Sequence, residues 1–409
     1  MRVEDVDIPA YIYDLAEVRR SYERLRAALP QPSTVYYSLK ANPHPAVTAA
    51  LGGLGAHAEV CSSGELEVAL AAGIRPDQVL YTGPGKSRRE TIVAVEAGVR
   101  RFSVDSPRGL DDLDKVAAAC GAELECLVRV NDDRPTPGQG LTMTGVASPF
   151  GADVGWIEDE PARFADRDGV RVVGLHLYMG SNLVDEAALL AQFAQSIQTA
   201  ARLEKALDAR FSVLDLGGGF GAPYARAGEL PVMPHLAERL ADMLDEAFGG
   251  WRDSAPAVWF ESGRYLTATC GRLVTRVLDA KRSNGRSVVV LESGINHLGG
   301  MSGLRRLPQI TPTLVDAESG EAGEPVSDAM VAGPLCTPLD LWASRTSVPP
   351  LEPGQLVEVP NVGAYGLSAS LVSFLGHPFP AEVIVDDGRI VETTRLRLLR
   401  EHVSDNEKE

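Results

Sequence analysis

The sequence has few cysteines and no long apolar run. Its five cysteines, at positions 61, 120, 126, 270 and 336, are odd in number and widely separated. This usage indicates a reducing, cytoplasmic compartment and argues against a disulfide scaffold or a zinc cluster, so we expect no metal site. No apolar run approaches the roughly 20 residues that a membrane helix needs. The N-terminus is acidic and lacks the apolar core of a secretory signal.

Positive charge is also scarce. The chain has 39 lysines and arginines against 56 aspartates and glutamates, which gives a net charge of −17. Such a surface repels nucleic acid and anionic membranes, so we expect neither as a partner. A local basic patch over an anionic cofactor stays compatible with this charge. A length of 409 residues and a hydrophobic content of 44% indicate a globular protein of two domains.

Strand-like and helix-like segments alternate in the first two thirds of the chain. Eight short runs have the composition of parallel strands that are buried on both faces: 34–37, 57–60, 79–82, 101–104, 124–130, 171–178, 212–216 and 257–261. Helix-like stretches lie between them at 64–73, 88–98, 107–119 and 184–209, with glycines placed as caps at 73, 98 and 121. This alternation predicts a (β/α)8 TIM-like barrel, with a doubly wound open sheet as the alternative.

The pattern changes after Gly271. Strand-like runs follow at 272–281, 287–292, 355–360, 381–385 and 389–392. No long amphipathic helix separates these runs, so we predict a second, mostly β domain. We place the barrel at 30–268 and form the second domain from 1–29 and 269–409. Segment 318–324 is expected to be a solvated loop, and the tail 402–409 to be frayed.

Lys40 directly follows the first predicted strand. An ammonium group is strongly hydrated, so a lysine at this place either reaches solvent or acts in a pocket. A pocket lysine can present a free amine that condenses with a carbonyl. The active site of a barrel lies at the C-terminal ends of its strands. Several other polar or glycine positions also follow predicted strand ends: Glu59, Arg129, Ser181, 217–219 and 261–264.

Two of these strand ends predict ligand-binding groups. Segment 214–221 (LDLGGGFG) leads from a strand into glycines, whose backbone N–H groups can approach a phosphate closely. A tight turn without a ligand is the alternative. Glu261 could pair with a pyridinium nitrogen, and Arg264 could hold a phosphate or carboxylate. A salt bridge between these two residues at the barrel rim is the alternative.

Two further candidates lie in the second domain. Cys336 is part of a Gly/Pro-rich segment, 333–340 (GPLCTPLD). A free cysteine is often inert packing, but a thiol in an active site can deliver a proton to carbon. Tyr365 ends a strand, where tyrosine is often an amphipathic filler. Its phenol could instead contact a cofactor phosphate.

In order and spacing, these motifs resemble those of the fold-type III pyridoxal-phosphate decarboxylases, the ornithine/diaminopimelate decarboxylase family. The resemblance runs from about Ile8 to Val391. It implies pyridoxal 5′-phosphate as the cofactor and an alanine-racemase-like two-domain architecture. It also implies a homodimer with shared active sites, because the family's cysteine loop reaches the site of the partner subunit.

The resemblance also implies a role for each matching residue. Segment 37–42 (YSLKAN) looks like the family's Schiff-base lysine motif, with Lys40 as the anchor. Glu261 matches the acid at the pyridine nitrogen, and Cys336 matches the proton-donating cysteine. The remaining cofactor contacts fall on Glu59, Arg129, Tyr178, Ser181, Gly218, Gly219, Gly263, Arg264 and Tyr365, and the substrate contacts on Thr337, Asp340 and Arg264.

Two departures from the family pattern bear on the substrate. Tyr178 replaces the histidine that stacks on the pyridine ring, which keeps an aromatic face but loses the imidazole proton. Thr337 replaces an acid that holds the distal ammonium of diamine precursors, and a neutral hydroxyl forfeits about 1.5–3 kcal/mol. Segment 295–302 lacks the arginine of diaminopimelate enzymes, and Arg305 and Arg306 are either contacts for a remote anion or a solvated pair.

This pattern resembles the subgroup that acts on modified amino acids or on aminoacyl groups tethered to acyl carrier proteins, including siderophore precursors. We therefore predict a pyridoxal-phosphate-dependent α-decarboxylase, a carboxy-lyase, that releases CO2 and an amine. Decarboxylation of free diaminopimelate, ornithine or lysine is the alternative. A racemase or aldolase is less favoured, because a racemase typically places arginine where Glu261 stands. A non-catalytic pyridoxal-phosphate-binding protein would resemble the barrel alone.

Overall fold

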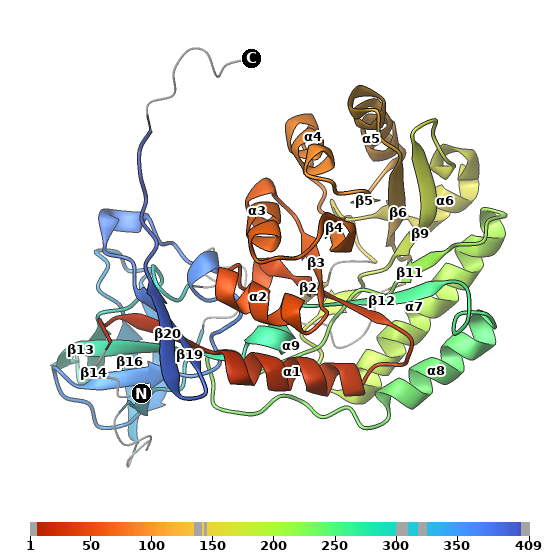
Figure 1. Cartoon of the computed structure of the whole chain (residues 1–409). Helices are drawn as coiled ribbons and strands as arrows, with labels where there is room; N and C mark the ends of the chain where they lie inside the picture. The colour runs from red at the N-terminus through yellow and green to blue at the C-terminus, as the bar shows by residue number, and fades with distance from the viewer. Residues whose placement is uncertain (1–5, 135–140, 143–144, 300–309, 318–324, 402–409) are drawn as a thin grey trace. The chain divides into compact units, whose positions relative to one another are not determined.

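The structure is a computed structural model that describes residues 6–134, 141–142, 145–299, 310–317 and 325–401. Arg305, Arg306, the predicted loop 318–324 and the tail 402–409 lie outside these residues. The chain forms two compact units (Figure 1): Leu15–Tyr224 with Gly228–Cys270, and Met1–Asp14 with Ala225–Ala227 and Gly271–Glu409. Within the described ranges, no helix combines the length and the apolar character that crossing a membrane requires.

The larger unit is a closed barrel of eight parallel strands. They follow each other around the barrel in chain order, and β12 pairs with β2 to close it. The strands are β2 (Thr34–Ser38), β3 (His57–Val60), β4 (Val79–Tyr81), β5 (Arg101–Val104), β6 (Leu124–Asn131), β9 (Val170–His176), β11 (Val213–Asp215) and β12 (Ala257–Ser262). Each agrees with a predicted strand to within two residues. The barrel is thereby confirmed, and the doubly wound sheet is excluded.

Helices surround these strands (Figure 1). They are α1 (Leu15–Ala27), α2 (Pro45–Gly53), α3 (Ser63–Ala71), α4 (Arg88–Glu96), α5 (Pro107–Cys120), α6 (Val154–Asp159), α7 (Glu186–Ala206), α8 (Leu236–Ala247) and α9 (Arg264–Thr267). Shorter elements lie in the connections: η2 (Leu39–Ala41), η3 (Pro76–Gln78), β7 (Leu141–Thr142), β8 (Ala152–Asp153), η4 (Pro161–Phe164) and β10 (Gly180–Ser181).

Helix α5 shows how the sequence sets these boundaries. The hydroxyl of Ser106 caps its N-terminus by accepting from the N–H of Gly109, and Pro107 occupies the first turn, where its missing N–H has no cost. Gly121 ends the helix in the left-handed conformation, with φ of 60°. Leu110 and Leu113 are buried on its inner face. The cap predicted at Gly121 is confirmed.

The barrel interior changes from apolar to polar along the strands. Five buried side chains form one apolar cluster. Four of them come from alternate strands and the fifth is Trp259 of β12; the four are Tyr36, Leu80, Leu127 and Val213. Side chains two residues apart on a strand face the same way. Further toward the C-terminal ends, two successive sets of buried side chains are polar: Glu59, Ser103, His176 and Glu261, then Ser38, Thr82, Arg129 and Asp215. Polar groups are therefore concentrated at the C-terminal end of the barrel.

The smaller unit is mostly β, as predicted. Its strands are β1 (Ala10–Asp14), β13 (Gly271–Ser283), β14 (Arg286–Leu291), β15 (Val315–Asp316), β16 (Val326–Ala332), β17 (Leu341–Val348), β18 (Leu356–Val359), β19 (Ala381–Asp386) and β20 (Arg389–Thr394). The sheet order is β17-β16-β14-β13-β1-β19-β20, with β18 against β13 and β15. Two short helices, η6 (Leu367–Ala369) and η7 (Phe374–Gly376), follow β18.

Five strands of this sheet correspond to the predicted runs, whereas β1, β15, β16 and β17 do not. The β16–β17 ladder has register shifts, for example between Val326 and Ala329. A register shift interrupts the alternation of inward and outward side chains on which a strand prediction depends. The two strands therefore lack a clear sequence signal.

Glu382 is a buried acid in this sheet. It lies in β19 beside the apolar cluster that contains Ala381 and Val383, and it is 8% exposed. Burial raises the pKa of its carboxyl to about 7; the hydrogen bond from the Tyr13 hydroxyl opposes this rise, and the charge of Glu392 adds to it. The folded chain therefore favours the neutral form of this side chain.

We expect Glu382→Gln to change how stability depends on pH. The pKa of Glu382 in the folded chain lies above its unfolded value of 4.5. The neutral carboxyl therefore contributes its full stabilisation of the fold below pH 4.5, and this contribution is lost as the pH rises through 7. The free energy of unfolding of the wild type should fall relative to the variant between pH 5 and 8, by up to about 3 kcal/mol. Urea unfolding at several pH values measures this. Glu352→Gln, at an exposed position of the same unit, is the control, and equal pH profiles for wild type and Glu382→Gln would contradict the prediction.

Candidate active site

Lys40 lies in the turn η2, immediately after β2. Its Nζ donates to both carboxylate oxygens of Glu59, at 3.1 and 3.0 Å. Glu59 also accepts from the Thr82 hydroxyl at 2.5 Å and from the Cys61 thiol at 3.2 Å. Burial opposes the charged form of Glu59, but the positive charge of Lys40 and the hydrogen bonds to the carboxylate outweigh it and lower its pKa to about 2. Glu59 is thus ionised and holds the lysine at the end of the first barrel strand.

Tyr178 provides an aromatic surface between two cations. The Lys40 Nζ lies 6.0 Å from the centre of its ring, and the Arg129 guanidinium lies 5.8 Å from it. Arg129 is buried and also covers the ring of Phe150 at 4.7 Å. Cations at such distances are attracted to the negative ring face. The structure therefore brings Lys40 and Arg129, two of the residues predicted at strand ends, to the same aromatic ring, that of Tyr178.

A second cluster of polar side chains lies inside the barrel. His176 Nε2 is 3.4 Å from Glu261 Oε1, and His176 Nδ1 is 2.9 Å from the Ser103 hydroxyl. Asp215 accepts from the N–H of Gly217 at 2.9 Å. Burial, followed by the charge of Glu261, raises the pKa of Asp215 to about 7. Burial lowers the pKa of His176, but the charges of Glu261 and Asp215 outweigh this effect, and the pKa is raised.

This cluster contains buried polar atoms without a hydrogen-bond partner: Glu261 Oε1, Asp215 Oδ2 and His176 Nε2. Such atoms are uncommon in folded proteins, because each costs about 1–3 kcal/mol when it is left unsatisfied. The ligand atoms of these three residues lie within 4.8 Å of one another, so the set could also hold a metal ion. The arrangement can therefore accept a cationic or hydrogen-bond-donating group at the barrel centre.

Glycines let the backbone close tightly around this cluster. A Cβ on Gly218 would lie 2.3 Å from the carbonyl oxygen of Glu261, and one on Gly263 would lie 2.7 Å from Ala41 Cβ. Gly219 has φ of 111°, where a side chain is strained, and a Cβ there would lie 2.7 Å from Gln192 Nε2. These contacts explain why glycine is required at these three positions of the barrel.

Ser181 and Arg264 lie on neighbouring segments of the same unit. Ser181 is in β10, two residues before Leu183, whose N–H donates to the carbonyl of Gly219 at 2.8 Å. Arg264 is the first residue of α9, and its guanidinium lies 5.7 Å from the ring centre of Tyr224.

The candidates of the smaller unit lie on two loops. Cys336 is exposed, and the next residue, Thr337, accepts from the N–H of Asp340 at 3.2 Å. The buried Asp340 carboxylate accepts from the N–H groups of Ile295 at 2.8 Å and Leu335 at 2.7 Å. Asp340 thereby ties the cysteine loop to the segment that follows β14.

Tyr365 is the fourth candidate of this unit. It has φ of 53°, a conformation that few residues other than glycine adopt. Such a conformation persists only where the surrounding structure determines it, and it is enriched at functional sites. The position is half-buried.

Four residues of this site are not among those predicted from the sequence: Thr82, Ser103, His176 and Asp215. Each lies in or directly after a correctly predicted strand, and each occupies an interior position of the barrel. The period of two divides each strand into two faces, but the register of the closed barrel decides which face is interior and which residues of different strands meet.

A closed barrel with a lysine, a buried acid cluster and a glycine loop at one end defines a barrel enzyme that binds a cofactor on that face. The chain matches the family model described as pyridoxal-dependent decarboxylase, pyridoxal binding domain, over residues 15–268. The chain therefore belongs to the family of pyridoxal-dependent decarboxylases, and its cofactor is pyridoxal 5′-phosphate.

Two curated proteins and one solved structure illustrate this similarity. The L-glutamyl-[BtrI acyl-carrier protein] decarboxylase of Niallia circulans is 30% identical and covers 93% of this chain and 90% of its own length. The diaminopimelate decarboxylase of Archaeoglobus fulgidus is 31% identical, and the match covers 95% of this chain and 90% of that protein. The crystal structure of the lysine decarboxylase of Selenomonas ruminantium is 27% identical, covers 93% of both chains and has a TM-score of 0.79.

We expect Gly218→Ala to disturb the glycine loop, because the new Cβ would meet the main chain at Glu261. The free energy of unfolding should fall by about 1–3 kcal/mol, and the variant should bind pyridoxal phosphate more weakly. Urea unfolding of the apoprotein and titration with the cofactor measure the two effects. Gly53→Ala, at a helical position with nothing within 4 Å of the new Cβ, should be neutral or slightly stabilising. A Gly218→Ala variant with unchanged stability and affinity would show that the loop relaxes freely.

Proposed function

We propose that this chain removes the α-carboxyl group of an aminoacyl substrate that is attached to a carrier protein, with Lys40, Glu261 and Cys336 as the principal catalytic residues. The observation that carries the proposal is the Glu261 carboxylate, whose buried Oε1 accepts no hydrogen bond and, among the described residues, has only the His176 ring, at 3.4 Å, as an ion-pair contact. A buried carboxylate is stable only with a compensating donor or cation. A protonated pyridine nitrogen is such a group.

The other residues of the barrel fit the same cofactor. The amine of Lys40 can bind its aldehyde carbon, and the ring of Tyr178 offers a flat surface for the pyridine. Glycines 218, 219 and 263, together with Ser181, offer close backbone approach and a hydroxyl for the phosphate. Arg264 and Tyr365 are proposed as further phosphate contacts. Glu59, which accepts a hydrogen bond from Lys40, is proposed to position that lysine. Arg129, whose guanidinium lies 5.8 Å from the ring centre of Tyr178, is proposed to position that ring.

The residues divide the reaction between them. When bound, pyridoxal phosphate supplies a sink for the electron pair left on the α-carbon as CO2 departs. Glu261 would keep the proton on the ring nitrogen, and His176 Nε2 lies 3.4 Å from the Glu261 Oε1. The Cys336 thiol then gives its proton to the α-carbon and regains one from solvent. Lys40 displaces the amine product.

Residue 337 and one relative support a carrier-linked substrate. Thr337 offers no charge to a distal ammonium group, so the substrate should lack one or have it masked. The Niallia circulans relative, at 30% identity, is a decarboxylase of a glutamyl group on an acyl-carrier protein. A glutamyl side chain carries no distal ammonium, which agrees with a neutral residue at position 337. Thr337 and Asp340 are proposed as substrate-side residues, of which Asp340 shapes the loop.

Decarboxylation of free diaminopimelate is the second candidate, because a relative with that name is 31% identical over 95% of this chain. We also propose a homodimer in which the Cys336 loop completes the partner's site. The exposure of Cys336 in the single chain supports this arrangement. The scattered free cysteines support a cytoplasmic location.

The function is tested by CO2 release from L-glutamyl-BtrI carrier protein, free glutamate, diaminopimelate, ornithine and lysine. We expect the carrier-linked substrate to have the highest kcat/KM. Lys40→Ala should abolish CO2 release and the visible absorbance of the bound cofactor, whereas Lys205→Ala, at an exposed lysine of the same unit, should leave both unchanged.

Two results would overturn this proposal. Racemisation or retro-aldol cleavage without CO2 would favour the racemase or aldolase alternative. A cofactor absorbance that no amino acid or aminoacyl carrier alters would indicate a non-catalytic binding protein. A preference for free diaminopimelate would keep the decarboxylation but correct the substrate.

We expect Cys336→Ala to lower kcat by about 10²–10⁴-fold, the usual contribution of a positioned proton donor. Cofactor absorbance should persist, because Cys336 is not proposed to hold the cofactor. Steady-state kinetics and the amine-to-CO2 ratio measure the effect. Cys120→Ala, a half-buried cysteine at the end of α5, is the matched control, and wild-type kcat in Cys336→Ala would remove this residue from the mechanism.

A further inference from the structure

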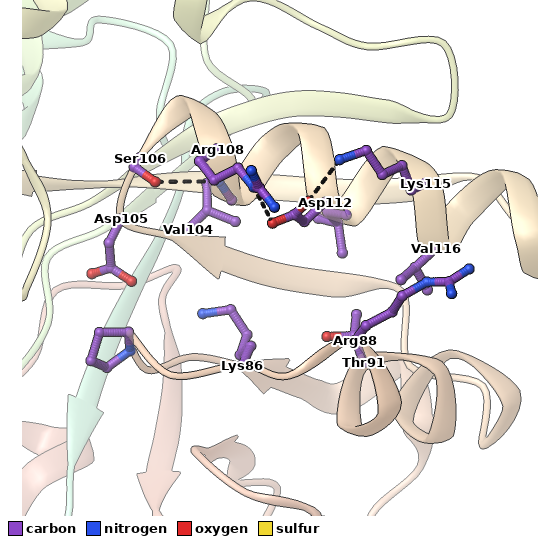
Figure 2. Close-up of a pocket in the computed structure, with 13 residues that line it drawn as sticks. Lys86, Arg88, Thr91, Val104, Asp105, Ser106, Arg108, Asp112, Lys115 and Val116 are labelled. Carbon is purple, nitrogen blue, oxygen red and sulfur yellow. Dashed lines mark hydrogen bonds and ion pairs between the residues drawn. The ribbon is translucent and has the colours of Figure 1, made fainter. Parts of the chain in front are cut away.

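A basic groove lies on the outside of the barrel, between α4 and α5 (Figure 2). Its volume is about 350 Å³. The segment from Pro84 to the start of α4 forms one wall, and the first turns of α5 form the other. Lys86 points into the space from one side, and Arg108 and Asp112 lie on the opposite side. The groove therefore begins where β4 and β5 end, on the C-terminal face of the barrel.

Positive charge predominates in this groove. Four cations line it, Lys86, Arg88, Arg108 and Lys115, against two carboxylates, Asp105 and Asp112. The excess, 4 − 2 = +2, stands out in a chain with a net charge of −17. The N-termini of α4 and α5 add partial positive charge at the same place.

The two carboxylates are already engaged. Asp112 is shared between Arg108 at 2.6 Å and Lys115 at 2.8 Å, and Asp105 accepts from the N–H of Gly151 at 2.7 Å. The side chain of Arg88 makes no hydrogen bond or ion pair with any residue that the structure describes. Asp112 balances only one of the two positive charges of Arg108 and Lys115, and the side chain of Arg88 has no carboxylate partner in the described part of the chain. This part of the surface therefore attracts a further anion.

The exposure of the cations indicates a macromolecular partner. The side chains of Arg108 and Lys115 are 78% and 60% exposed. They are seven residues apart on α5, which places them about 10 Å apart along the helix axis. A small anion needs donors that converge on one point, whereas exposed charges spread over two turns match an acidic protein surface.

The groove adjoins the lysine site through a short chain of contacts. The Thr82 hydroxyl donates to Glu59, which holds Lys40. Gly83 follows Thr82 directly, and its carbonyl accepts from Lys86 at the edge of the groove. A partner bound in the groove would therefore lie next to the end of the barrel at which the substrate reacts.

We propose that the α4–α5 groove is the docking surface for an acidic face of the carrier protein that presents the aminoacyl group to Lys40. This inference rests on the proposed carrier-linked substrate and adds the place where the carrier binds. Charges on the rim of an interface chiefly steer association and set its salt dependence. The groove compensates locally for the general repulsion between this acidic chain and an acidic partner.

The test measures binding and turnover separately. Binding of the Niallia circulans BtrI carrier protein to the cofactor-loaded enzyme is titrated at several salt concentrations. Turnover is followed with L-glutamyl carrier and with L-glutamyl pantetheine, which lacks the protein. We expect Arg88→Glu/Arg108→Glu/Lys115→Glu to weaken carrier binding by about 10-fold or more and to flatten its salt dependence. Turnover of the pantetheine substrate should stay within about twofold.

A matched variant controls for the charge change. Arg75→Glu/Arg163→Glu/Arg171→Glu reverses three exposed, ion-paired arginines elsewhere on the barrel unit and should leave carrier binding within about twofold of wild type. Arg88→Glu alone breaks no ion pair, so it repeats the test if the triple variant folds poorly. It should weaken carrier binding by about 3-fold or more.

The outcomes separate this inference from the proposed function. Unchanged affinity and salt dependence in the groove variants, or no carrier binding by the wild type, would overturn the docking surface even if CO2 is released. Groove variants that change the affinity for inorganic phosphate but not for the carrier would show a small-anion site and overturn it as well. Carrier binding that depends on the groove without CO2 release would support the docking surface and reject the proposed reaction.

Discussion

The structure depends on how the barrel accommodates buried negative charge. Glu59, Asp215 and Glu261 are each at most 2% exposed, and an uncompensated buried carboxylate costs several kcal/mol. Lys40 and Thr82 compensate Glu59. Asp215 is relieved by the N–H of Gly217 and by a pKa raised to about 7, chiefly through burial. Glu261 keeps one oxygen without a hydrogen bond. The barrel therefore carries two buried acceptors without a hydrogen bond at its centre, Glu261 Oε1 and Asp215 Oδ2, and such acceptors suit a cationic ring nitrogen.

Along each barrel strand, the earlier interior residues stabilise the fold and the later ones form the candidate active site. Their first interior positions form an apolar cluster around Tyr36 and Trp259, which supplies hydrophobic stabilisation. Their later interior positions are polar and meet at the C-terminal end. Because the closed ladder holds all eight strands in register, the polar side chains are positioned before any ligand binds. Such preorganisation is what a catalytic site requires.

The residues proposed to bind the cofactor lie mainly on the barrel unit, whereas Thr337, which is proposed to face the substrate, lies on the smaller unit. The cysteine loop is tied by the buried Asp340 carboxylate, which occupies the space beside Gly294 and Gly333, where a Cβ would lie within 2.6 Å of its oxygens. These contacts hold the loop that carries Cys336 and Thr337, the residues that we propose for proton donation and for substrate contact.

The sequence alone determined the barrel strands, the mostly β second unit and the cofactor, and it placed Lys40 at the end of the first barrel strand. Strand composition, helix caps and strand-end motifs are local signals, so they can be read without coordinates. Only the tertiary structure showed that Lys40 pairs with Glu59, that His176 and Asp215 surround Glu261, and that cations from α4 and α5 line one groove. These features join residues that lie far apart in the chain, and barrel closure and strand register decide which of them meet.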